Sequence, residues 1–202
     1  HQLMTRAGMI KKLGAGISPI RRLLDAGVTI GLGTDGVCSN DTARIFDVMR
    51  TAALVQSATG PDHERWVSAQ DILKAATSGG ARTALLDGIT GSLEVGKRAD
   101  LIMLRLDSLA FTPLNDIVRQ LVYAENGASI ERVMVEGEIV VEQGRLTRID
   151  EGAVLAEIRQ AMPAFLADHA EIEARNSIFH PYFNEIHRRA TAVGQHEAAV
   201  AA

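Results

Sequence analysis

The first hydrophobic positions of the chain have helical spacing. Ser18 and Pro19 precede an apolar face that includes Ile20 and Leu23, and Gly27 follows it. Serine can cap the free N–H groups of a helix, proline suits the first helical position, and glycine commonly follows the last turn. The pattern therefore predicts a helix that begins near Ser18 and ends before Gly27.

The next segment has the pattern of a buried strand. Residues 28–32 form a short apolar run, Val-Thr-Ile-Gly-Leu, that is rich in β-branched residues and ends in the glycine-flanked turn 33–36. An uninterrupted apolar run is typical of a parallel strand that is covered on both faces. The turn places Asp35 at the carboxyl end of this strand.

Two more helices are predicted before the pattern changes. One runs from about Asp41 to about Thr59, with apolar residues repeating along one side. The next begins at Ser68, where Asp71 completes a capping-box pattern, and is expected to stop at the glycine pair 79–80. The order of helix, strand and helices is typical of a β/α barrel, although such a barrel needs eight strands.

Strand periodicity replaces helical periodicity near Gly88. A turn-rich connector at 91–97 leads to a predicted strand at 101–106 and, after a helix around 117–122, to a hairpin within 130–141. The chain becomes helical again from Glu151 onward, with Pro163 as a potential kink. These shifts predict three parts: 1–87, 88–150 and 151–202.

Composition excludes several classes of protein. The 202 residues are 47% hydrophobic and 23% charged, which is ordinary for a globular protein, and the net charge of −4 comes without a basic stripe. Nucleic acid and an anionic membrane are therefore poor partners. The single cysteine, Cys38, excludes an internal disulfide framework and fits a reducing cytosol. A run of about 18 apolar residues is absent, and the segment that starts at His1 does not have the pattern of a signal peptide.

Several segments resemble one family in the same order along the chain. Gly-Ile-Ser-Pro-Ile-Arg-Arg-Leu-Leu-Asp-Ala-Gly at 16–27, Gly-Leu-Gly-Thr-Asp-Gly at 31–36 and Ser-Asn-Asp at 39–41 resemble the seventh helix and eighth strand of metal-dependent amidohydrolases. The group of methylthioadenosine/S-adenosylhomocysteine deaminases and triazine chlorohydrolases is the most similar. Residues 75–101 resemble the entry into the family's small β-sandwich, and 133–146 resemble its closing hairpin.

The resemblance implies an α/β fold. The three parts would be the end of a (β/α)8 TIM-type barrel (1–87), part of the small β-sandwich domain (88–150) and a C-terminal helical extension (151–202). It also implies a hydrolase that acts on carbon–nitrogen bonds other than peptides and deaminates or dechlorinates a nitrogen heterocycle.

One Zn²⁺ or Fe²⁺ per active site is part of the same implication. The family's ligands are a His-x-His pair, two further histidines and the aspartate that ends the eighth strand. Only that aspartate has a counterpart here, which is Asp35, the implied metal ligand and catalytic residue. The six histidines of the chain include no His-x-His pair and none follows an apolar strand: His1, His63, His169, His180, His187 and His196. The chain alone is therefore expected to be inactive.

Each candidate residue also has a structural interpretation. Asp35 after glycine suits an Asx turn or a helix cap, and Ser39, Asn40 and Asp41 form a capping signal. Ser39 and Asn40 are nevertheless candidates to bind the heterocycle. Cys38 lacks a neighbouring base or second thiol and is best interpreted as a small packed side chain.

Two hypotheses for function remain open. The first is the hydrolase, with a small heterocyclic substrate, a cytoplasmic location and a homo-oligomeric state. The second is a non-catalytic scaffold that is stable only in an oligomer, with the long C-terminal helix as its interaction surface.

Overall fold

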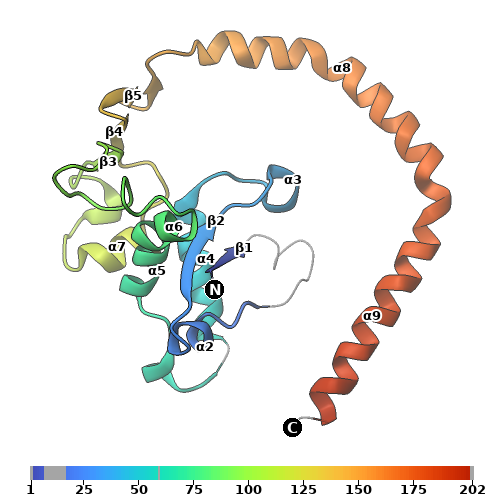
Figure 1. Ribbon diagram of the computed structural model, residues 1–202. Coiled ribbons are helices and arrows are strands. Elements are labelled where there is room, and N and C mark those ends of the chain that lie inside the picture. The colour runs from blue at the N-terminus through green and yellow to red at the C-terminus, as the bar shows by residue number, and fades with distance from the viewer. Residues whose placement is uncertain (1, 7–16, 59, 201–202) are drawn as a thin grey trace. The chain divides into compact units, whose positions relative to one another are not determined.

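The computed structural model describes residues 2–6, 17–58 and 60–200, with the backbone only for 2–6, 38, 39 and 191–200. His1, Gly16 and Thr59, which the sequence patterns include, lie outside the described residues. The chain separates into two compact units, 1–148 and 149–202 (Figure 1).

The first unit contains two parallel strands. The predicted strand is confirmed as β2 (Thr29–Gly33), with Ile30, Gly31 and Leu32 buried in succession. It pairs in parallel with β1 (Gln2–Arg6), from Gln2 opposite Thr29 to Arg6 opposite Gly33. The sequence did not predict β1, because Thr5 is the only β-branched residue in Gln-Leu-Met-Thr-Arg.

The helix before β2 is confirmed with a different start. Helix α2 (Ile20–Asp25) begins after Pro19, and its first turn has no side-chain cap, so the capping role predicted for Ser18 is wrong. The Ser18 carbonyl instead accepts hydrogen bonds from the Ile20 N–H and from the Gln56 side chain, each at 2.8 Å. Gly27 adopts a φ of +72° and ends the helix as predicted.

The helix expected from Asp41 begins later. A short helix, α3 (Val37–Asn40), follows the Asp35 turn, and Asp41 leaves it with a φ of +62°. A residue with left-handed backbone angles cannot continue into a right-handed helix. Helix α4 (Ile45–Ser57) therefore starts four residues further on, and its cap, Arg44, makes no capping side-chain bond.

The next helix confirms the capping box but not the predicted stop. In α5 (Ala69–Ala76), the Ser68 hydroxyl accepts from the Asp71 N–H at 3.1 Å, and the Asp71 carboxylate accepts from the Ser68 N–H at 3.2 Å. The glycine pair 79–80 lies inside a further helix, α6 (Ser78–Thr83), instead of ending α5. The reason is tertiary: α6 packs so closely on β2 that a side chain at Gly79 would clash with the strand.

The rest of the first unit is an antiparallel sheet with one helix. Its strands lie in the order β3 (Leu101–Leu104), β4 (Ile130–Val135), β5 (Glu138–Glu142) and β6 (Arg145–Leu146). The predicted hairpin turn is confirmed, since Glu136 and Gly137 have φ values of +53° and +86°. Helix α7 (Ile117–Tyr123) is also confirmed and packs on α4 and α5.

The segment that contains β2 and the segment that contains α7 contribute to one hydrophobic core. Val122 of α7 is fully buried in the same cluster as Ile30 of β2 and Ile72 of α5. The short 3-10 helices η1 (His63–Arg65) and η2 (Leu109–Phe111) lie in connecting loops. The predicted division of this unit at residue 88 stays a prediction.

The second unit is helical from Glu151 to Val200. Helix α8 (Glu151–Asn176) continues through Pro163, and the 3-10 turn η3 (Ser177–Phe179) joins it to α9 (His180–Val200). Within the described part of the chain, no helix is both long enough and apolar enough to cross a membrane.

Candidate active site

Asp35 lies two residues beyond the carboxyl end of β2. Because β1 and β2 are parallel, their carboxyl ends, Arg6 and Gly33, are paired at the same edge. In barrel enzymes this edge carries the catalytic side chains, since the βα loops begin there. The position expected for Asp35 at the end of a strand is therefore confirmed.

The backbone at Asp35 is unusual for a residue with a side chain. Its φ is +60°, in the left-handed region that aspartate and asparagine enter more readily than other non-glycine residues. The Thr34 hydroxyl donates to the Asp35 carbonyl at 3.3 Å, and Gly36 leads directly into α3. The side chain of Asp35 is exposed. Such backbone strain is found at many functional sites.

The two predicted substrate-binding residues lie in α3. The structure describes the backbone of Ser39 but not its side chain. Asn40 is half-buried, and its amide donates to the Thr42 carbonyl at 2.9 Å. Asn40 also lines a cavity of about 440 Å³ between α3 and α4, together with Thr42 and Asp47. Asp35 is not among the described residues that line this cavity, so a shared pocket for the three residues stays a prediction.

Metal donors do not cluster in the described part of the chain. It contains no group of three or more His, Cys, Asp or Glu side chains placed to hold a metal ion. A protein zinc site uses three or four such ligands, so the described residues by themselves do not fit a catalytic metal.

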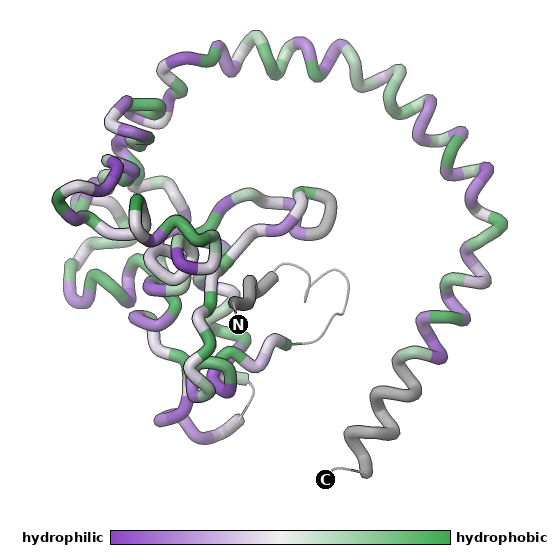
Figure 2. The backbone as a smooth tube through the Cα atoms, viewed as in Figure 1, coloured by the Kyte–Doolittle hydropathy of each residue, from purple (hydrophilic) through white to green (hydrophobic). Residues whose placement is uncertain are grey.

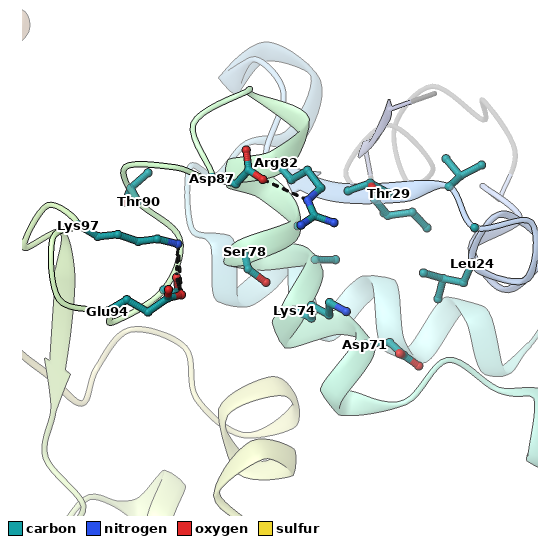
Figure 3. Close-up of a pocket in the computed structure, with 16 residues that line it drawn as sticks. Leu24, Thr29, Asp71, Lys74, Ser78, Arg82, Asp87, Thr90, Glu94 and Lys97 are labelled. Carbon is teal, nitrogen blue, oxygen red and sulfur yellow. Dashed lines mark hydrogen bonds and ion pairs between the residues drawn. The ribbon is translucent and has the colours of Figure 1, made fainter.

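A further cavity lies at the opposite end of β2. It has a volume of about 590 Å³ and is lined by Thr29 and Ile30 at the start of the strand, by α5 and α6, and by the connector before β3. Figure 3 shows Lys74, Arg82 and Lys97 around this space, with Arg82 paired to Asp87 at 3.2 Å. In barrel folds the amino-terminal end of the strands supports stability, and catalysis takes place at the other end.

Hydrogen bonds fix the connector beside that cavity. The Ser92 hydroxyl donates to Glu94 at 2.5 Å, and the Lys97 ammonium, whose side chain is largely buried, lies 3.3 Å from the same carboxylate. These two donors, Ser92 first, lower the pKa of Glu94 below its ordinary value. Asp100 accepts the Glu136 N–H at 2.7 Å, and this bond lowers the pKa of Asp100. This bond joins the segment just after the connector to the turn between β4 and β5.

One buried carboxylate could not have been found from the sequence. Glu125 is only 2% exposed, and its Oε1 accepts the N–H groups of Gly127 at 2.6 Å and Ser129 at 3.1 Å. Its Oε2 is buried without a hydrogen-bond partner among the described residues. A glutamate between Ala and Asn-Gly has the local pattern of an exposed loop. Only the packing therefore shows that Glu125 is a buried acceptor of loop N–H groups.

The chain belongs to the amidohydrolase family, whose model matches residues 6–140. It is 44% identical over 146 residues to the 5-methylthioadenosine/S-adenosylhomocysteine deaminase of Natronomonas pharaonis, which covers 72% of the chain and 33% of that protein. It is 40% identical over 146 residues to the deaminase of the same name from Desulforudis audaxviator, covering 72% of the chain and 34% of the relative. The chain thus spans about a third of the length of these relatives.

Solved structures of zinc-containing enzymes share the fold. An adenosine deaminase from Xanthomonas campestris with bound zinc superimposes with a TM-score of 0.78 at 33% identity, over 82% of this chain and 38% of that one. An atrazine chlorohydrolase from Arthrobacter aurescens in complex with zinc gives a TM-score of 0.72 at 32% identity, over 78% of this chain and 35% of that one. The resemblance inferred from the sequence is therefore confirmed.

Proposed function

We propose that a protein containing this chain is a metal-dependent hydrolase that removes an amino group or a halogen from a nitrogen heterocycle. The observation that carries the proposal is the position of Asp35 beyond the carboxyl end of a parallel strand, in a chain 44% identical to a deaminase. The deaminase and chlorohydrolase relatives support a substrate in which the bond to be broken joins a ring carbon to nitrogen or chlorine.

We infer that β1, β2 and the helices around them are the end of a (β/α)8 barrel, and that β3–β6 are part of a small β-sandwich. Two parallel strands followed by an antiparallel sheet support this arrangement. The remaining barrel strands would come from sequence that the relatives have and this chain does not match.

Asp35 is the residue to which the proposal gives a role. Its carboxylate would supply one oxygen ligand to a divalent metal, with zinc favoured over iron because two of the structural neighbours contain zinc. A carboxylate in this place can also hold a proton taken from water at the reacting carbon. Ser39 and Asn40 would contact the heterocycle. Because a lone carboxylate holds a divalent ion weakly, this chain alone is proposed to be inactive.

A scaffold without catalytic activity is the second candidate function. It is favoured by one observation, the row of exposed apolar side chains along α8. This hypothesis predicts self-association but no hydrolysis. A cytoplasmic location and a homo-oligomeric state are parts of the proposal for both functions.

The test uses the longer protein that supplies the remaining strands. It is purified with zinc and incubated with 5-methylthioadenosine, S-adenosylhomocysteine, adenosine, an aminotriazine and a chlorotriazine, and released ammonia and chloride are measured. Turnover of at least one purine or triazine that stops on chelation and returns with zinc supports the hydrolase. Absence of ammonia and chloride with every substrate, from protein that contains zinc, would exclude it.

A further inference from the structure

Exposed side chains on the second unit follow a coiled-coil repeat. From Leu155 to Ile186, over more than four heptads, mostly apolar residues recur at spacings that alternate between three and four positions. We call this set of residues the heptad stripe. The stripe consists of Leu155, Ile158, Met162, Phe165, His169, Ile172, Asn176, Phe179, Phe183 and Ile186. Figure 2 shows hydrophobic and hydrophilic residues interleaved along α8.

The apolar members of the heptad stripe are exposed to water, except Met162, which is half-buried. Phe165, Ile172 and Ile186 have 60%, 47% and 62% of their surface exposed. At about 1.5 Å per residue the stripe is about 46 Å long, far more than an isolated exposed side chain. A long, mostly apolar stripe of this kind is typical of an interface with another protein.

The two prolines of the helical segment lie outside the stripe. Pro163 and Pro181 both fall at heptad positions that face away from the stripe. The 3-10 turn between α8 and α9 keeps right-handed helical angles at Ser177 and His180, so the right-handed winding of the chain continues across it. Every second stripe position, from Ile158 to Ile186, is Ile or Phe.

We propose that this stripe pairs with the same stripe of a second copy of the chain, in a parallel coiled coil. The polar stripe residues identify the occupant. In a parallel, in-register pair, Asn176 faces Asn176 of the other copy and His169 faces His169, so each polar side chain meets a polar partner. An unrelated apolar surface would leave the Asn176 amide unpaired in an apolar interface.

The charges beside the stripe oppose this orientation only weakly. Asp168 and Glu173 lie at the flanking positions that face each other across a parallel pair, whereas an antiparallel pair would place Asp168 near Arg175. Both carboxylates are exposed, and exposed charges contribute less than an amide that is buried without a partner.

The first test measures the mass of the 202-residue chain by sedimentation equilibrium over a range of concentrations. The expected result is a mass that is a whole multiple, two or more, of 21.7 kDa. Ile172→Asp should raise the dissociation constant more than about 100-fold, because it places a carboxylate in the apolar interface. The matched control, Ala174→Asp, adds the same charge on the outer side of the same helix and should leave the mass unchanged.

The second test distinguishes orientation and does not depend on loss of folding. Asp168→Arg would place the new guanidinium opposite Glu173 in a parallel pair and opposite Arg175 in an antiparallel pair. Because the proposed pair is parallel, this variant should tighten association roughly threefold. Circular dichroism confirms that each variant remains helical. A monomer at every concentration, or an oligomer that Ile172→Asp does not weaken, would overturn the proposal. Weaker association of Asp168→Arg would overturn the parallel orientation.

Discussion

Gly79 of α6 lies so close to Ile30 of β2 that a Cβ on the glycine would be 2.4 Å from the Ile30 carbonyl oxygen. Real Cβ atoms do not approach a backbone oxygen at that distance, so the helix can cover this strand only without a side chain at 79. The strand in question leads to Asp35. The glycine therefore contributes to the placement of the candidate site.

Gly79→Ala should lower the free energy of unfolding by about 1–3 kcal/mol, because the new methyl group forces the helix away from the strand. Gly80→Ala is the matched control: its Cβ would lie 3.4 Å from the Ala75 carbonyl oxygen, an ordinary contact. Alanine also favours a helix over glycine by up to about 1 kcal/mol, so this control should not destabilise. Urea unfolding followed by circular dichroism measures both, and equal losses would contradict the close packing.

Glu125→Ala should destabilise the loop between α7 and β4. The change removes the acceptor of the Gly127 and Ser129 N–H groups, and Ser129 is buried. Leaving these donors without a partner costs about 1–3 kcal/mol. Asn126→Ala removes a comparable bond, to the Ala128 N–H at 3.0 Å, from an exposed side chain and should cost less than about 1 kcal/mol. A loss for Glu125→Ala no greater than for Asn126→Ala, in the same unfolding assay, would refute the buried role.

The first unit should lose stability in acid through Asp100. The Glu136 N–H lowers the pKa of this carboxyl below its ordinary value of 3.8. A lowered pKa in the folded state means that the stabilisation is present above the ordinary pKa and disappears as the pH falls through the folded-state pKa. The urea midpoint of unfolding is measured at about pH 6 and about pH 3, above and below the ordinary pKa. The change in midpoint between these two pH values should be smaller in Asp100→Asn than in the unaltered chain. Asp107→Asn, which alters an exposed carboxyl after β3, should keep the full difference.

Local patterns predicted the elements that are stabilised by local contacts. The capping box of α5 needs only Ser68 and Asp71, three residues apart, and the hairpin turn needs only Glu136 and Gly137. The glycine pair 79–80 was interpreted as a helix stop, because its contact with β2 joins residues almost fifty positions apart in the sequence. The strand β1 was missed for a similar reason, since its pairing with β2 is what defines it.

The position of Asp35 at a strand end was predicted from the sequence, and its role as a metal ligand stays a prediction. The run 28–32 and its glycine-flanked turn were sufficient to place Asp35 at a strand end. A metal site is a tertiary constellation of three or four ligands, and the described residues bring no such group together. The roles of Ser39 and Asn40 likewise depend on a substrate pocket, and stay predictions.

The proposal that Asp35 is a ligand of a divalent metal can be tested by the zinc content of the protein. Asp35→Asn and Asp41→Asn are compared in the longer protein, because both aspartates are exposed and have nearly the same φ, 60° and 62°. Asparagine adopts this backbone as readily, so neither change should disturb the fold. Asp35→Asn should lose its zinc, as measured by elemental analysis, and should no longer release ammonia. Asp41→Asn should retain both the zinc and the ammonia release. Stoichiometric zinc and undiminished turnover in Asp35→Asn would contradict the claim.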